Sequence, residues 1–255
     1  MEALIFVLVF FFGSLIGSFL NVCIYRIPKE ESIAFPPSHC GSCNTQLKAK
    51  DLLPIFSYLF LKGKCRYCSE KVSKQYPLIE GLTGLLFLGV FIRYGFSIET
   101  IIFCALTALL IVIAMIDLKT QYIYTSTIVT GIVIGIIYFI LCFIYKQDFN
   151  LINMLIGAVI PALILALIVW LTNAMGWGDV ELIFMVGLFL GFELGILNLF
   201  LSIVIGGVIG AVLMVIKLKK VGDGIAFGPY IAIGTYFTLL YGENILNWYI
   251  NTFFR

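Results

Sequence analysis

Long apolar runs recur along almost the whole chain, and they constrain its fold more than any other feature. A helix needs about 20 apolar residues to cross the hydrocarbon core of a bilayer, so runs of this length predict transmembrane helices. We predict eight spans, at residues 4–25, 77–93, 98–116, 125–145, 151–172, 181–194, 197–216 and 226–244. The chain is 62% hydrophobic and 12% charged, and a soluble protein of 255 residues could not bury that much apolar surface. The expected fold class is an all-α polytopic membrane protein.

The spans divide the chain into three segments. Residues 1–25 form a first transmembrane helix, residues 26–76 form a soluble loop domain, and residues 77–255 form a seven-helix membrane domain. The first run lacks the basic start and the small-residue cleavage pattern of a secretory signal, so we interpret it as a retained helix. Residues 194–197, with Gly195, are predicted to form the tight turn of a helical hairpin over 181–216.

Basic residues in the loops predict the orientation. The 26–76 segment carries nine Lys and Arg residues, and the loops on its side of the membrane bring the total to 13, against three on the other side. Loops rich in Lys and Arg face the cytoplasm. The loop domain should therefore be cytoplasmic, and Asp117 and Asp179 should emerge in cytoplasmic loops on that same face. No nucleic-acid-binding module is evident in the sequence.

The soluble loop contains two pairs of closely spaced cysteines, Cys40 with Cys43 and Cys65 with Cys68. Two C-x2-C knuckles at this separation predict a closed, structural four-thiolate zinc site. About 50 residues bury too little surface to fold alone, so a structural metal is expected. The single histidine, His39, could replace one thiolate, but we interpret it as a solvated loop residue.

A carboxylate between glycines, in the stretch Gly176-Trp-Gly-Asp179, is the main candidate for chemistry. An acidic residue at a helix end can simply be a cap, and this is the alternative for Asp117 and Asp179. If the two meet in a poorly solvated site, they can share one proton and activate water for hydrolysis of a peptide bond. Glu181 and Asp223 are competing partners for Asp179.

Another acidic residue, Glu80, lies just inside the second predicted span, near the cytoplasmic face. A buried glutamate is costly unless it is paired, so Glu80 is a candidate for a second function or for helix pairing. The remaining cysteines, at 23, 104 and 142, lie in apolar runs and are expected to pack as small hydrophobic residues.

Several of these motifs, in this order, resemble the type IV prepilin peptidases, which are membrane aspartic proteases with a G-x-G-D motif. The matching blocks are Gly17-Ser-Phe-Leu-Asn21, the paired cysteines, Asp51-Leu-Leu-Pro54, Tyr76-Pro-Leu-Ile-Glu80, Ile116-Asp117, Gly176-Trp-Gly-Asp179 and Phe227-Gly-Pro229-Tyr. The chain departs from the family pattern at Tyr124, where a proline is frequent, and at Glu181, where a lysine is usual.

The resemblance implies an activity and a location. Family members cut prepilins or pseudopilins after a glycine at the cytoplasmic face of the inner membrane, and the catalytic pair would be Asp117 and Asp179. Many members also methylate the new N-terminus with S-adenosylmethionine, and Glu80 is our candidate residue for that step. Prepilins and the lipid bilayer are the expected partners. The alternatives are a small membrane transporter and a non-catalytic pilus-assembly scaffold, each with a zinc-stapled loop.

Overall fold

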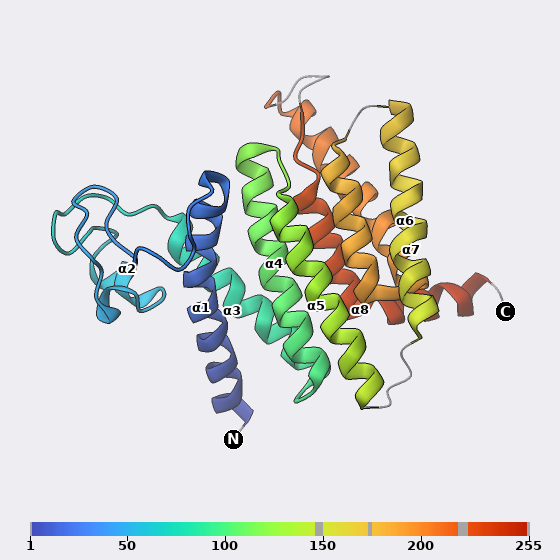
Figure 1. The fold of residues 1–255 in the computed structure, drawn as a ribbon, viewed down its shortest axis with the longest axis horizontal. Helices are drawn as coiled ribbons and strands as arrows, with labels where there is room; N and C mark the ends of the chain where they lie inside the picture. Colours follow the sequence, from blue (N-terminus) through green and yellow to red (C-terminus); the bar gives the residue numbers. More distant parts are fainter. Residues whose placement is uncertain (1, 146–149, 173–174, 219–223, 254–255) are drawn as a thin grey trace. The chain divides into compact units, whose positions relative to one another are not determined.

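The computed structural model describes residues 2–145, 150–172, 175–218 and 224–253. Within these ranges the regular elements are helices, and the segment from residue 27 to residue 74 is mostly turns and loop with two isolated antiparallel bridges. The α-helices are α1 (Glu2–Arg26), α2 (Phe56–Phe60), α3 (Gln75–Tyr94), α4 (Ile98–Thr120), α5 (Thr125–Ile144), α6 (Leu151–Thr172), α7 (Trp177–Val215) and α8 (Gly228–Phe253) (Figure 1). Short 3-10 helices lie at Ile27–Lys29 and Ala49–Asp51.

Six of the described helices are long and apolar enough to cross a bilayer, namely α1, α3, α4, α5, α6 and α7. The predicted fold class, a multi-pass all-α membrane protein with a small cysteine-bearing loop, is confirmed. The eight predicted spans correspond to these helices, with α7 counted as two arms, and to α8. Helix α8 is not one of the six, and it runs to Phe253, well past the predicted end at residue 244.

The chain divides into two compact units, residues 1–112 and 113–255, with the boundary inside α4. The three segments that we predicted from the sequence, 1–25, 26–76 and 77–255, stay a prediction. In the first unit, α1 packs against α3. Their backbones approach closely because α1 has glycines at the contact: a Cβ on Gly17 would lie 2.8 Å from the Cα of Glu80. Small residues allow such close helix packing in membranes.

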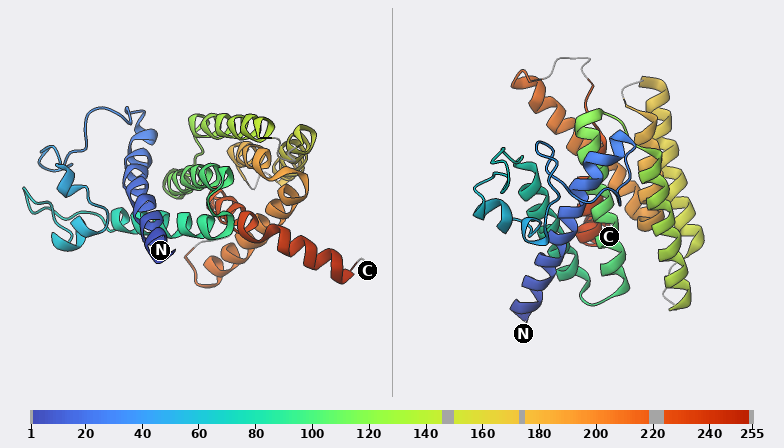
Figure 2. Two further views of the ribbon diagram at one scale, coloured as in Figure 1. Left: turned by 90° about the horizontal axis from the view of Figure 1, so that it is seen from below. Right: turned by 60° about the vertical axis from the view of Figure 1, so that its left-hand side comes forward.

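In the second unit, α7 packs against α5, α6 and α8 (Figure 2). Helix α7 is broken at Gly191, which has φ 71° and ψ −172°, a conformation that glycine adopts at little cost. Both Gly187 and Gly195, four residues to either side of the break, lie opposite Gly157 of α6. The chain therefore reverses along α6, and α7 consists of a first arm, residues 177–190, and a second arm, residues 192–215.

The predicted hairpin exists, but the predicted turn at Gly195 is wrong. Residues 194–197 are helical, and the reversal occurs at Gly191. The physical reason lies in α6. The break at Gly191 leaves the Phe192 N–H without a helical hydrogen bond, and the side-chain oxygen of Asn153 accepts a hydrogen bond of 3.0 Å from it. A long-range partner of this kind selects one glycine among several and cannot be read from the apolar pattern.

The second arm of α7 and α8 enclose a small polar cluster. Asn198, Ser202 and Thr235 are each at most 1% exposed. The hydroxyl of Thr235 lies 3.4 Å from the side-chain oxygen of Asn198, and Ser202 donates to the Asn198 carbonyl at 2.7 Å. Hydrogen bonds of this kind hold membrane helices together. This cluster ties the second arm of α7 to α8 through buried polar side chains.

Replacing Gly187 by alanine is expected to destabilise the second unit. The added Cβ would meet the Gly157 carbonyl oxygen and would lie 2.6 Å from the Cα of Ala158, and neither backbone atom can move cheaply. Overpacking of this kind costs about 1–3 kcal/mol of unfolding free energy. The matched control is Gly207→Ala, in the second arm, where a Cβ meets nothing within 4 Å. Thermal unfolding in detergent should separate the two variants, and equal stability would contradict the packing described here.

Candidate active site and metal centre

Two aspartates from separate helices line one pocket in the second unit. Asp117 lies in the last turn of α4 and Asp179 in the first turn of α7, and they are 4% and 6% exposed. Both line a pocket of about 470 Å³, and their side chains are near enough for their charges to interact. The two candidates that the sequence singled out are thus brought together at one site. They lie within helix ends, whereas we had placed them in loops.

The start of α7 holds Asp179 in place. Its backbone N–H donates to the Gly176 carbonyl at 3.2 Å, and its carboxylate accepts a 3.1 Å hydrogen bond from the Gly176 N–H. A carboxylate at this third helical position is also favoured by the helix dipole. Gly178 serves a different purpose, because a Cβ there would lie 3.0 Å from the Cβ of Ile123. The two glycines of the motif therefore have separate roles, one as a donor and one in packing.

The start of α8 holds Asp117. The Gly228 N–H donates to its carboxylate oxygen Oδ2 at 2.9 Å, across more than a hundred residues of sequence. A Cβ on Gly228 would lie 2.8 Å from that same oxygen, so a larger residue would push the carboxylate away. The positive ends of two helices, α7 and α8, thus approach the two carboxylates, which favours negative charge at the site.

The competing carboxylates fare differently. Glu181 lines the same pocket but is exposed, on a different face of α7 from the buried Asp179. Asp223 lies outside the described residues.

Gln121 also supports the site, although we predicted no role for it from the sequence. Its side chain donates to the Gly224 carbonyl at 2.8 Å and ties α4 to the segment that precedes α8. We also predicted no role for Gly228, although the stretch Phe227-Gly-Pro229-Tyr was one of the blocks that match the family.

The four paired cysteines form one cluster in the first unit. The sulfurs of Cys40, Cys43, Cys65 and Cys68 all lie within 4.8 Å of one another, and those of Cys40 and Cys68 are 3.8 Å apart. Tetrahedral zinc with Zn–S bonds of about 2.3 Å requires sulfurs about 3.8 Å apart. The separation is far too long for a disulfide. The cluster therefore fits the predicted four-thiolate zinc site.

The two cysteine knuckles have the same backbone. In each, the first cysteine donates its N–H to the carbonyl five residues on and accepts from the N–H four residues on, as Cys40 does with Thr45 and Asn44. The residue four positions on has positive φ in both, 53° at Asn44 and 60° at Ser69. Two equivalent knuckles present their sulfurs to a common point, as a tetrahedral ion requires.

The electrostatics of the cluster suit a bound cation. Hydrogen bonds from backbone N–H groups lower the pKa of the Cys40 and Cys65 thiols, and Thr45 lowers that of Cys43. For Cys68, a backbone hydrogen bond at Glu70 lowers the pKa, but desolvation and the neighbouring thiols outweigh it and raise the pKa to about 12. Four thiolates together therefore need a metal ion to offset their charge.

The other cysteines and the histidine lie outside this cluster. His39 is exposed, and its Nδ1 lies 3.1 Å from the Pro37 carbonyl, which fits our interpretation of it as a solvated loop residue. Cys23 and Cys142 are buried in helices and Cys104 is half-buried, which fits packing roles.

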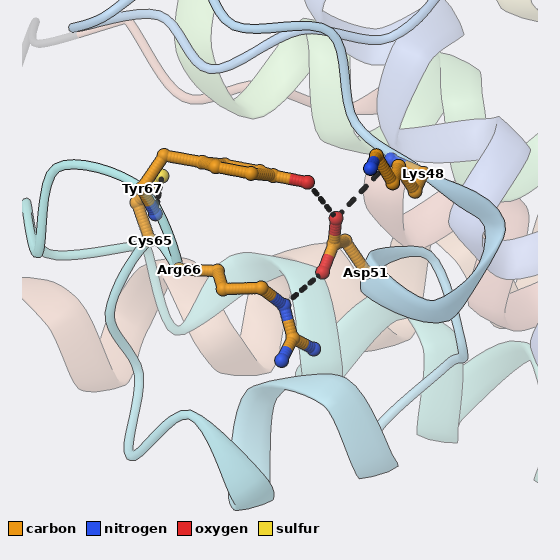
Figure 3. A network of polar contacts seen from close by, with 5 residues as sticks. All are labelled: Lys48, Asp51, Cys65, Arg66 and Tyr67. Carbon is orange, nitrogen blue, oxygen red and sulfur yellow. Dashed lines mark hydrogen bonds and ion pairs between the residues drawn. The ribbon is translucent and has the colours of Figure 1, made fainter.

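An ion pair braces the cysteine loop. Asp51 accepts hydrogen bonds from Arg66 at 2.5 Å, Tyr67 at 2.9 Å and the Lys48 N–H at 3.1 Å (Figure 3). Desolvation opposes the charge on Asp51, but these hydrogen bonds outweigh it and lower the pKa of the carboxyl group. Arg66 and Tyr67 lie between the second pair of cysteines, so Asp51 holds that knuckle against the segment that joins the two knuckles.

Glu80 is buried in α3, beside a strained turn. It is 6% exposed, and its Oε2 accepts a 2.7 Å hydrogen bond from the Ile55 N–H. Ile55 has φ 63° and ψ −52°, a strained conformation for a β-branched residue. Glu80 makes no ion pair with any of the described residues.

Two family models match the chain, one in its N-terminal part and one in its C-terminal part. Residues 11–94 match the bacterial peptidase A24 N-terminal domain, and residues 104–211 match the type IV leader peptidase family. A prepilin leader peptidase/N-methyltransferase of Bacillus subtilis is 34% identical over 244 residues, covering 95% of this chain and 97% of the relative. Relatives of the same name from Pseudomonas putida and Aeromonas hydrophila are each 31% identical and cover 91% and 98% of this chain, and 89% and 95% of their own lengths. No solved structure matches the chain.

Proposed function

Because this chain belongs to the type IV leader peptidase family, we propose that it is a membrane aspartic endopeptidase that removes the leader from prepilins or pseudopilins. The observation that carries the proposal is the convergence of Asp117 and Asp179 on one pocket at the ends of α4 and α7. The chain covers most of the length of relatives named for this activity, which supports the same assignment.

In this proposal the two aspartates share one proton. The ionised carboxylate takes a proton from water, and the resulting hydroxide attacks the carbonyl carbon of the scissile bond. The protonated partner donates a hydrogen bond to the carbonyl oxygen and stabilises the negative charge that develops there. The proton then passes to the leaving amine, so no covalent intermediate with the enzyme forms. The N–H groups of Gly176 and Gly228 keep both carboxylates directed into the pocket.

The proposed location is the bacterial inner membrane, with the aspartate pocket at the cytoplasmic face. The excess of basic residues on the side of the cysteine loop supports this orientation. The apolar helix of a prepilin would then lie among lipid or helices while its leader stays in the cytoplasm. The scissile bond would lie at the membrane boundary, where Asp117 and Asp179 end their helices.

The proposal includes a second activity, methylation of the new N-terminus with S-adenosylmethionine as the methyl donor. The names of the relatives support this activity. Glu80 is the candidate residue for it, because it is a buried carboxylate remote in sequence from the aspartate pair. The cysteines at 40, 43, 65 and 68 would hold a structural zinc ion, which has no open coordination position and takes no part in the chemistry.

The transporter and scaffold alternatives are not favoured. The family match and the paired aspartates in a pocket are expected of a peptidase, and neither alternative requires them. Coexpression with a prepilin followed by mass analysis of the pilin N-terminus is the test. We expect a product shortened by its leader and carrying one added methyl group. A pilin that keeps its full leader would contradict the peptidase proposal, and a shortened product with only a free amine would contradict the methyltransferase part.

A further inference from the structure

Large apolar side chains stand in a row on the surface of the cysteine-bearing segment. In the short helix α2, Phe56, Leu59 and Phe60 are 51%, 63% and 82% exposed, and Leu53, just before the helix, is 45% exposed. Residues three and four positions apart share one face of a helix, so these side chains form one surface. We call these four residues the apolar row.

The opposite side of α2 faces the interior of the first unit. Ser57 and Tyr58 line a large pocket between α1, α3 and the cysteine-bearing segment, and no residue of the apolar row lines it. Helix α2 is therefore held by one face and presents the other outward. Whatever covers the apolar row lies outside the described part of the chain.

Ile55, the residue just before α2, fixes the level of this helix along α1 and α3. Its N–H donates to Oε2 of Glu80 at 2.7 Å, and the backbone of Glu80 lies against Gly17 of α1. Glu80 is five residues, or about 7.5 Å, from the start of α3, and Gly17 is nine residues, or about 13.5 Å, from the end of α1. The segment thus returns from the ends of these helices to a level beside their apolar stretches.

This level is that of the membrane interface. Both α1 and α3 are long and apolar enough to span a bilayer, so lipid surrounds their apolar stretches. A helix that lies on a bilayer buries its apolar face about 5–10 Å into the boundary between headgroups and acyl chains. The distance of Glu80 from the start of α3 falls in this range, so the apolar row meets lipid.

The charges beside α2 complement anionic lipid. Residues 52–69 contain three basic and no acidic residues. Arg66 is paired with Asp51, whereas Lys62 and Lys64 are exposed and make no ion pair with any of the described residues. Lysines beside an apolar face can extend their ammonium groups to headgroup phosphates while the face stays in the acyl layer.

We propose that α2 is an interfacial anchor of the cysteine-bearing segment. The apolar row inserts into the leaflet beside this segment, and Lys62 and Lys64 bind anionic phospholipid headgroups. The anchor holds the cysteine cluster close to the membrane surface. The inference goes beyond the proposed reaction, because it requires only that α1 and α3 span a bilayer.

The test places a fluorine reporter on the apolar row. A trifluoromethyl-phenylalanine replaces Phe60 in the full-length, zinc-loaded protein, in nanodiscs of phosphatidylcholine and phosphatidylglycerol that hold one copy each. Fluorine relaxation by dissolved oxygen, which concentrates among acyl chains, is compared with relaxation by a neutral, water-soluble nickel chelate. The ratio of the oxygen effect to the nickel effect should exceed that of a solvent-exposed control by at least about threefold, as expected for a side chain several ångströms inside the interface.

The matched control carries the same reporter at Phe35, which is 75% exposed. Arg26, the last residue of α1, donates to the carbonyls of Ser32 and Pro36, so Phe35 is held near the end of that helix and farther from its apolar stretch than α2. The zinc content of both labelled proteins should equal that of the unlabelled protein, which shows that the segment is folded.

Two results would overturn the anchor. Equal ratios at positions 60 and 35 would show that the apolar row faces water. Protection of position 60 from both relaxation agents would show that a protein surface covers it in place of lipid. Comparing discs that hold one copy with discs that hold two would identify a second copy of the chain as that surface.

The role of the lysines is tested by lipid composition. Adding phosphatidylglycerol to phosphatidylcholine discs should raise the oxygen-to-nickel ratio at position 60, because anionic headgroups attract Lys62 and Lys64. Lys62→Gln/Lys64→Gln should lose most of this rise, and the same rise as in the wild type would overturn the headgroup contact. The control is Lys29→Gln, which removes an exposed ammonium group that lies over the Tyr25 ring near the end of α1, and it should keep the rise.

Discussion

Asparagine in place of Asp117 or Asp179 is expected to stop leader removal while the protein remains folded in the membrane. Each asparagine can still accept the backbone hydrogen bond that holds the native carboxylate, from Gly228 or Gly176. Neither can share a proton with its partner or take one from water. Loss of general acid–base catalysis alone costs about 10²–10⁴ in rate. Cleavage of a prepilin, followed by gel shift or mass analysis, should therefore fall by at least about a hundredfold.

The variants can be compared in a way that tests whether the aspartates act as one unit. Removing both should cost little more than removing either, since groups that act together are far from additive. The control is Glu181→Gln, which removes an exposed carboxylate from the same pocket and should change cleavage by less than about threefold. If the Asp117 variant cleaved normally and the Glu181 variant did not, the catalytic pair would be a different one.

Serine at Cys40 and Cys43 is expected to release zinc and unfold the cysteine loop. Two of the four clustered sulfurs would be lost, and the remaining pair cannot complete a tetrahedral site. Zinc binding by small modules contributes about 10–16 kcal/mol of folding free energy at neutral pH. Few of the described side chains of the loop are buried, so its remaining hydrogen bonds and the Asp51 ion pair should not keep it ordered without the metal. Metal analysis and limited proteolysis of residues 26–76 measure the two effects.

A matched control is Cys104→Ser, which alters a half-buried cysteine in α4 and should leave the zinc content unchanged. A chelator applied to the wild type should reproduce the protease sensitivity of the double variant. A loop that stays protected after its metal is removed would show that the ion is not what holds it together.

The sequence predicted the parts of the molecule that depend on local pattern. Apolar runs located the helices, and the cysteine spacing located the thiolate cluster. Asp117 and Asp179 were identified because a carboxylate at the end of an apolar run is unusual. The prediction that they share one face was a matter of counting spans, and both do line one pocket.

The features that were missed depend on contacts between distant segments. The reversal of α7 is at Gly191 because Asn153 accepts the Phe192 N–H, which the break frees. The sequence near residue 191 gives no indication of this partner. Gly228 supports Asp117 from the start of another helix. Asp51 accepts hydrogen bonds from Arg66 and Tyr67, and this pairing depends on how the loop folds around its four sulfurs. Long-range hydrogen bonds of this kind leave no periodic trace in a sequence.

The break at Gly191 also limits the length of the helix that carries Asp179. Residues 177–190 rise only about 21 Å, while the hydrocarbon core of a bilayer is about 30 Å thick. A segment shorter than the core forces the surrounding lipid to thin or to admit headgroups and water alongside it. Water and polar headgroups would thus reach deeper next to this arm than elsewhere on the protein. This would bring water to the scissile amide bond of the prepilin, whose helix is otherwise apolar.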